Sequence, residues 1–126
     1  MKLAHARIVT NDVPRLTRFY REVTGMTPKG DDIYVEFHAP ELALAISSQK
    51  VLERYAGATL PASNRSMILD FEVADVDRER MRLASIVGEF VLEPTTQPWG
   101  NRSMLFRDPD GNLINMFAVV RAPVEA

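Results

Sequence analysis

The chain has 126 residues, 46% of them hydrophobic and 25% charged, and a formal net charge of -2 from 15 basic and 17 acidic residues. This size and composition fit one globular domain, and the balanced charge, with no run of Lys or Arg, argues against nucleic-acid binding. The absence of Cys excludes disulfides, thiolate metal ligands and a Cys nucleophile, and no apolar run approaches the roughly 18 residues that span a membrane. Because the N-terminus also lacks the apolar core of a signal peptide, we expect a cytoplasmic protein.

The first predicted elements are a strand and a helix. Residues 3–10 alternate weakly between apolar and polar side chains, which is typical of a strand. Asp12 is the expected N-cap of the helix, Pro14 fits a first turn that needs no N–H donor, and Gly25 is the expected terminator. One apolar stripe with helical spacing is predicted to face a sheet and consists of Leu16, Phe19, Tyr20 and Val23.

Three strands are predicted to complete a first module over residues 1–50. A short strand spans residues 26–29, and residues 33–39 and 42–48 form a hairpin around Pro40-Glu41. In residues 33–39, Val35 and Phe37 are predicted to face the core, and the polar side chains on the other face are Tyr34, Glu36 and His38. The alternation leaves open whether this polar face borders a binding groove or solvent.

A second module repeats this order after a linker. The linker covers residues 51–65 and starts with a short helix at 51–55, and the second module covers residues 66–121. A shift of 63 residues places Asp12 on Asp75, so a strand at residues 66–73 and a capped helix ending at Gly88 are expected. Further strands are predicted at residues 90–95, 102–106 and 113–120, and Asp108-Pro109-Asp110-Gly111 is predicted to form a type I turn between the last two.

Two similar modules imply a groove between them, and strand alternation indicates which side chains face it. His5 and Arg7 share one face of the first strand, and the matched residues of the second module are Ile68, Asp70 and Glu72. Arg7 and Asp70 either grip a polar ligand or form an internal ion pair that closes the groove. His5 can serve as a general base, a ligand hydrogen-bond partner, a remaining metal ligand or a polar residue of the groove wall.

The loop over residues 97–102 combines the only Trp of the chain, Trp99, with Arg102. An indole ring and a guanidinium at the rim of a groove are typical of ligand contacts, because binding residues concentrate on loops held by rigid scaffolds. The alternative is a fixed turn in which Trp99 seals the hydrophobic core or a dimer interface.

The order of these features resembles the vicinal oxygen chelate superfamily, which includes glyoxalase I, extradiol dioxygenases, fosfomycin-modifying enzymes and bleomycin-resistance proteins. The resemblance is carried by His5, by Asp12-Val13 and Phe19-Tyr20, and by residues 106–114 near the end of the chain. It implies an α+β fold in which two βαβββ modules form a U-shaped cleft within a single domain over residues 1–126. It also implies a homodimer.

The resemblance further implies a set of metal ligands on the first and last strands of each module. The first-strand position is His5, whereas the other three positions fall on Ala45, Ile68 and Asn115. Two aliphatic side chains and an amide do not complete a coordination sphere around one imidazole. We therefore predict that the chain holds no metal ion and no other cofactor.

The sequence thus predicts a metal-independent small-molecule-binding protein that sequesters an aromatic antibiotic or metabolite. No catalytic residues and no membrane partner are predicted, and the expected ligand contacts are His5, Arg7, Asp70, Trp99, Arg102 and Asn115. The alternative is a divalent-metal enzyme, either a glyoxalase-type lyase or isomerase or a dioxygenase, with His5 as a ligand. Its remaining ligands would have to come from Glu36, His38, Asp70 and Glu72.

Overall fold

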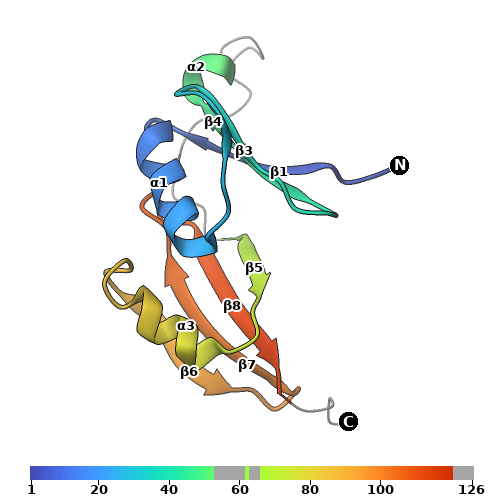
Figure 1. Ribbon diagram of the computed structural model, residues 1–126, viewed down its shortest axis with the longest axis vertical. Helices are drawn as coiled ribbons and strands as arrows, with labels where there is room; N and C mark the ends of the chain where they lie inside the picture. The colour runs from blue at the N-terminus through green and yellow to red at the C-terminus, as the bar shows by residue number, and fades with distance from the viewer. Residues whose placement is uncertain (53–61, 63–65, 121–126) are drawn as a thin grey trace. The chain divides into compact units, whose positions relative to one another are not determined.

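The computed structural model describes residues 1–52, 62 and 66–120, which belong to two compact units at residues 1–62 and 63–126 (Figure 1). The first unit contains β1 (His5–Thr10), α1 (Val13–Thr24), β2 (Lys29–Gly30), β3 (Tyr34–Phe37), β4 (Ala43–Ser48) and α2 (Gln49–Leu52). The second unit contains β5 (Ile68–Glu72), α3 (Val76–Leu83), β6 (Phe90–Thr96), β7 (Asn101–Arg107) and β8 (Leu113–Val119). The predicted α+β class and the order strand, helix and three strands in each module are confirmed.

The boundary between the units falls inside the predicted linker. Residues 53–61 and 63–65 of that linker, including the end of the short helix expected at 51–55, lie outside the described residues, as do residues 121–126. Within the described part of the chain, no helix has the length and apolar character that crossing a membrane requires.

Each unit forms one four-stranded sheet with the same kind of strand order. The first sheet has the order β1-β4-β3-β2, in which β1 and β4 are parallel and the other neighbours antiparallel. The second sheet has the order β5-β8-β7-β6, and its parallel pair is β5 and β8. In both units the last strand lies between the first and third strands. This central position decides which side chains of the outer strands meet across it.

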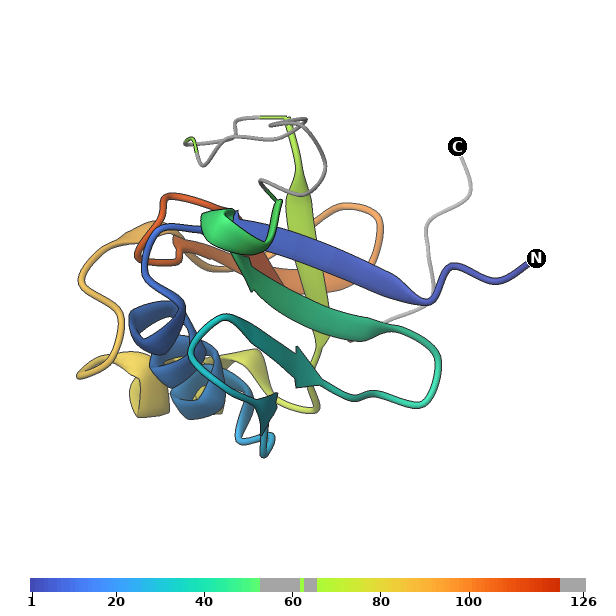
Figure 2. The same ribbon diagram turned by 90° about the horizontal axis from the view of Figure 1, so that it is seen from above.

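The helix α1 covers one face of the first sheet (Figures 1 and 2). Its ends are those expected, because the Asp12 carboxylate accepts from the Arg15 N–H at 3.1 Å and Gly25 adopts a left-handed φ of 71°. The predicted apolar stripe is buried, and the ring of Tyr20 meets that of Phe37 with centroids 6.5 Å apart. Phe37 therefore faces the helix, as the alternation of β3 predicts.

The strand predicted at residues 26–29 is wrong in its position, since β2 contains only Lys29 and Gly30. The reason is the turn that follows. The Asp31 carboxylate accepts from the N–H groups of Ile33 and Tyr34 at 2.9 and 3.0 Å, and the Asp31 N–H donates to the Tyr34 carbonyl at 3.0 Å. These bonds close a tight hairpin, so only Lys29 and Gly30 of the preceding segment pair with β3. They also lower the pKa of the Asp31 carboxyl.

The second unit differs from the prediction in the length of its helix. Asp75 caps α3 as expected, with its carboxylate accepting from the Arg78 N–H at 3.1 Å, but the α-helix ends at Leu83 rather than near Gly88. The chain there changes to turns, in which the N–H groups of Ile86 and Val87 both donate to the Leu83 carbonyl, at 3.0 and 2.9 Å. These turns keep Val87 buried, so the predicted apolar contact is retained without a regular helix.

The turn predicted at residues 108–111 is confirmed. The Gly111 N–H donates to the Asp108 carbonyl at 3.0 Å, which is the bond expected between the first and fourth residues of a β-turn. The Asp108 carboxylate accepts from the N–H groups of Asp110 and Asn112, both at 2.9 Å, and is almost fully buried. The turn thereby fixes the register of β7 against β8.

Candidate functional site

The face of the first sheet opposite α1 carries a group of ionisable and aromatic side chains. Because Phe37 faces the helix, the alternate side chains of β3 point away from it, and His5 and Arg7 of β1 take the same side. We call this surface the polar face of the first unit; it consists of His5, Arg7, Tyr34, Glu36 and His38 above Ala43, Ala45 and Ser47 of β4.

Glu36 is the centre of the polar face. Its Oε1 lies 2.9 Å from the His5 Nε2 and accepts from the Tyr34 hydroxyl at 2.6 Å, and its Oε2 lies 2.9 Å from the His38 Nε2. The hydrogen bond from Tyr34, together with the charges that the two imidazoles carry when protonated, lowers the pKa of the Glu36 carboxyl. Glu36 is therefore a carboxylate at neutral pH, and both of its oxygens are occupied by donors.

The contact between His5 and Glu36 crosses the central strand. In the sheet, His5 is paired with Ala43 on β4, and Glu36 is paired with Ala45 on the same strand. Neighbouring strands lie about 4.8 Å apart, so side chains from β1 and β3 can meet only by passing over β4. Ala45 is fully buried. Its single methyl group leaves room for the contact above it.

The contacts fix the protons of the two imidazoles. A carboxylate only accepts hydrogen bonds, so each neutral imidazole must carry its proton on Nε2, which leaves Nδ1 as an acceptor. The side chains of His5 and His38 are 38% and 60% exposed, so these acceptors are within reach of a ligand. The polar face thus presents two oriented imidazoles rather than two freely rotating ones.

We expect nitrogen NMR at pH 8 to show both His5 and His38 in the Nε2–H form. In Glu36→Ala, which removes the acceptor, each imidazole should revert to a mixture of the two neutral forms. Asp32→Ala, which removes an exposed carboxyl elsewhere in the same unit, is the control and should leave both spectra unchanged. Unaltered imidazole spectra in Glu36→Ala would contradict the assignment.

Arg7 and Tyr34 form the second contact across β4. The Arg7 guanidinium carbon lies 5.4 Å from the centre of the Tyr34 ring, a distance at which a cation interacts favourably with an aromatic face. The hydrogen bond that the Tyr34 hydroxyl donates to Glu36, followed by burial and the charge of Glu36, raises the pKa of Tyr34. The phenol therefore keeps its proton and stays a donor.

In the second unit, Asn115 and Asp70 are neighbours on the face opposite the buried residues of β8. They are paired across β8 and β5, and the Asn115 Nδ2 donates to the Asp70 carboxylate at 2.8 Å. The Asn115 Oδ1 is buried and has no hydrogen-bond partner among the described residues. Of the other residues predicted to share this face, Ile68 and Glu72 are exposed. The expected Arg7–Asp70 ion pair stays a prediction, because its two residues belong to different units.

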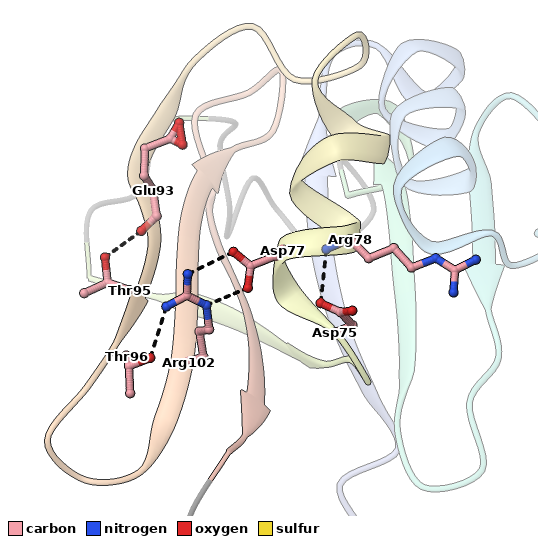
Figure 3. Close-up of polar contacts among 7 residues, drawn as sticks. All are labelled: Asp75, Asp77, Arg78, Glu93, Thr95, Thr96 and Arg102. Carbon is pink, nitrogen blue, oxygen red and sulfur yellow. Dashed lines mark hydrogen bonds and ion pairs between the residues drawn. The ribbon is translucent and has the colours of Figure 1, made fainter.

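Arg102 is engaged inside the second unit (Figure 3). Its guanidinium donates to both carboxylate oxygens of Asp77 on α3, at 2.7 and 2.9 Å, and to the Thr96 hydroxyl at 3.0 Å. The Arg102 guanidinium lowers the pKa of the Asp77 carboxyl, and Asp77 in turn raises the pKa of Arg102. These contacts tie Arg102 to α3, and its role as a ligand contact stays a prediction.

Trp99 lies in the turn between β6 and β7 and is 57% exposed. The turn is closed by the Gly100 N–H, which donates to the Gln97 carbonyl at 3.1 Å. The interpretation of Trp99 as a seal of the hydrophobic core is therefore wrong, because the ring stands outside the core of its unit. A ligand contact and a dimer interface both stay predictions.

The Arg102–Asp77 pair should make stability depend on pH. Because the Asp77 pKa is lowered by folding, its contribution is complete above the ordinary Asp pKa of about 4 and is lost as the pH falls through the lowered value. At pH 7, Asp77→Asn should lower Tm by about 1–4 °C, and the difference from the original protein should shrink between about pH 5 and pH 2. Thermal melts across this range check the expectation, with Asp32→Asn as the control; a constant difference would contradict it.

The residues at the positions implied for a metal ion do not fit one. The His5 imidazole is held by Glu36, Ala45 and Ile68 carry no donor atom, and the Asn115 amide nitrogen donates to Asp70. No group of three or more His, Asp or Glu side chains in residues 1–52, 62 and 66–120 is arranged to hold a metal ion.

The sequence alone leaves the roles of Tyr34, Glu36 and His38 open and does not single out Ser47. The signal for the first three was the polar alternation of β3, which placed them on one face but did not decide what that face borders. The small side chains at alternate positions of β4 were a second signal, because Ala43, Ala45 and Ser47 leave space between taller neighbours.

Comparison with known proteins finds a family and a relative that match nearly the whole chain. A sequence model of the Glyoxalase/Bleomycin resistance protein/Dioxygenase superfamily matches residues 2–116. The uncharacterized protein YraH of Bacillus subtilis is 25% identical over 128 residues, which cover 95% of this chain and 100% of that protein.

Solved structures show the same fold. A glyoxalase/bleomycin resistance protein/dioxygenase from Nocardioides has a TM-score of 0.80 at 22% identity, covering 100% of this chain and 89% of that one. A glyoxalase/bleomycin resistance protein/dioxygenase family enzyme from Burkholderia phytofirmans PsJN has a TM-score of 0.83 at 16% identity, covering 95% of this chain and 100% of that one. At these identities the two likenesses establish the fold alone.

Proposed function

Because this chain belongs to the Glyoxalase/Bleomycin resistance protein/Dioxygenase superfamily, we propose that it binds a small molecule on the polar face of its first unit without a metal ion. The observation that carries the proposal is the convergence of His5, Tyr34 and His38 on Glu36. These four side chains form an ordered polar surface above the small side chains of β4. An ordered surface of this kind limits the entropy that is lost when a ligand binds.

The chemistry of the polar face supports binding rather than catalysis. Sequestration requires affinity for a stable molecule, whereas catalysis requires groups that stabilise a transition state. The oriented imidazoles accept hydrogen bonds and Arg7 supplies a positive charge, but the face contains no side chain activated as a nucleophile. An aromatic antibiotic or metabolite is the proposed ligand class, and the contacts proposed for it in the first unit are His5 and Arg7.

In the second unit, Asp70, Asn115 and Trp99 stay proposed ligand contacts. The buried Asn115 Oδ1 supports this role because it has no hydrogen-bond partner among the described residues, and the exposed Trp99 ring offers a surface for stacking. We also propose that the protein is cytoplasmic and forms a homodimer, as composition and family suggest. Size-exclusion chromatography with light scattering tests the dimer.

The proposed function is tested by measuring ligand binding to protein from which a chelator has removed any metal ion. Trp99 fluorescence and calorimetry against a panel of aromatic antibiotics and metabolites should identify a ligand whose affinity is unaffected by the chelator. Glu36→Ala should weaken its binding about tenfold or more, because the imidazoles lose their orientation. Glu89→Ala, which removes an exposed carboxyl of the second unit, is the control and should leave the affinity unchanged.

The same experiment examines the alternative of a metal-dependent lyase, isomerase or dioxygenase. The observation that favours this alternative is the presence of two imidazoles and a carboxylate on one sheet face. Elemental analysis of protein purified without chelator gives the metal content. Stoichiometric metal that is lost in His5→Ala, or ligand binding that disappears with the metal, would overturn the proposed function.

A further inference from the structure

We propose that the ligand of the polar face is an anion such as a carboxylate, bound by the Arg7 guanidinium with the Ser47 hydroxyl beside it. This inference rests on the proposed function and specifies the charge of the ligand and the position of its charged group. It is carried by two observations. Arg7 has no ion-pair partner among the described residues, and the hydroxyl of Ser47 has no hydrogen-bond partner among them.

Arg7 is a cation without an acidic partner. No carboxylate among the described residues lies within ion-pair distance of it, and its contacts are with the ring and the hydroxyl of the neutral Tyr34 side chain. Glu36, the acid of the same face, already accepts from Tyr34, His5 and His38. Arg7 therefore has no direct ion-pair partner within the polar face.

Ser47 lies at the floor of the polar face. It is fully buried, and its hydroxyl oxygen has no hydrogen-bond partner among the described residues. Its side chain points to the same side as Ala45, two residues earlier on β4, so it is directed away from α1. A buried hydroxyl without a partner is unfavourable, and a ligand oxygen that reaches it removes this cost.

The sheet brings these two groups together. Ser47 is paired with Val9 on one side and with Tyr34 on the other, and Arg7 lies two residues before Val9 on β1. To lie over the Tyr34 ring, the Arg7 side chain must cross β4, and Ser47 is the residue of β4 next to that ring. The guanidinium and the hydroxyl therefore border the same space above the central strand.

A carboxylate matches this pair of groups. A guanidinium binds the two oxygens of a carboxylate side by side, and charge-assisted bonds of this kind are stronger than bonds between neutral groups. A hydroxyl can donate a further bond to the same anion. A cationic ligand would be repelled by Arg7 and would find the oxygens of Glu36 already occupied.

The charge of the ligand is tested with benzoate and its neutral analogue benzamide as probes. In nitrogen–proton NMR spectra, benzoate should shift the Arg7 Nε–H signal saturably. Benzamide should bind at least tenfold more weakly, because it has the same shape without the charge. No saturable shift with benzoate up to about 50 mM would overturn the inference, since that limit corresponds to negligible affinity.

Three variants of the polar face and one control locate the binding. Arg7→Gln should weaken benzoate binding at least tenfold, Ser47→Ala about threefold to tenfold, and Arg7→Lys less than Arg7→Gln because the charge is kept. Arg15→Gln removes an exposed charge of α1 and should have no effect. If Arg7→Gln fails to fold, the inference is tested by comparing the benzoate affinities of Arg7→Lys and Ser47→Ala with that of Arg15→Gln. Equal affinities in all four variants would overturn the inference.

The outcomes distinguish this inference from the proposed function. If Glu36→Ala weakens the binding of the ligand found in the panel while Arg7→Gln does not, and benzamide binds as well as benzoate, the polar face binds a neutral molecule. The inference then fails and the function stands. If neither Glu36→Ala nor Arg7→Gln changes the affinity, binding occurs elsewhere and both proposals fail.

Discussion

Replacing Gly30 with Ala is expected to destabilise the protein by about 3 kcal/mol or more. Gly30 has a φ of 142°, a backbone conformation that residues with a Cβ rarely adopt. A Cβ at this position would collide with the carbonyl oxygen of Tyr34 and lie 2.8 Å from the Cα of Val35. Both neighbours are backbone atoms of β3, so no side-chain rotation relieves the collision and the hairpin must open.

Two other glycines provide matched controls for this substitution. Gly25 also has a positive φ, 71°, but a Cβ there would meet nothing within 4 Å, so Gly25→Ala should cost only about 1–2 kcal/mol. Gly88 has open space and no positive φ, so Gly88→Ala should be close to neutral. Urea denaturation gives the three free energies of unfolding. A loss in Gly30→Ala no larger than that in Gly25→Ala would contradict the backbone collision.

The Gly30 substitution should also weaken ligand binding. Gly30 and Lys29 are paired with Val35 and Glu36 in the sheet, so displacement of β2 disturbs the strand that carries Glu36. We expect the orientation of the two imidazoles to be lost together with stability. The nitrogen NMR measurement described for Glu36→Ala detects this loss.

Ala45→Leu is expected to destabilise the protein by about 1–3 kcal/mol and to weaken ligand binding by about tenfold or more. Ala45 is fully buried on the central strand, between Arg7 and Glu36 in the register of the sheet. The contact of His5 with Glu36 passes over this strand at 2.9 Å. A branched side chain would occupy the space that the contact needs, so either the contact breaks or the sheet deforms.

The controls for Ala45→Leu test whether the effects come from the size of the new side chain at this buried position. Ala45→Ser adds one atom and should keep the contact of His5 with Glu36. Ala84→Leu makes the same change at an exposed position of the second unit and should leave stability within about 0.5 kcal/mol. Urea denaturation and the imidazole spectra provide the two readouts. Wild-type stability and unchanged imidazole spectra in Ala45→Leu would contradict the crossing contact.

The local elements of this fold could be predicted from the sequence because local chemistry determines them. Asp12 and Asp75 cap their helices, Gly25 ends the first helix, and the turn after Asp108 forms as expected. Each of these features depends on groups within four residues along the chain, and so it appears directly in the order of residue types. The period of two in a strand likewise predicted that Phe37 faces the helix.

The partners of the polar side chains were decided by the tertiary structure. Alternation assigns Glu36 to a face of its strand, but only the order β1-β4-β3 and its register bring that carboxylate across Ala45 to His5. Similarly, the sequence did not predict that Arg102 contacts Asp77, which is 25 residues away in the sequence. Contacts between distant residues depend on which strands become neighbours and on how they are aligned, and neither property is encoded by any short stretch of sequence.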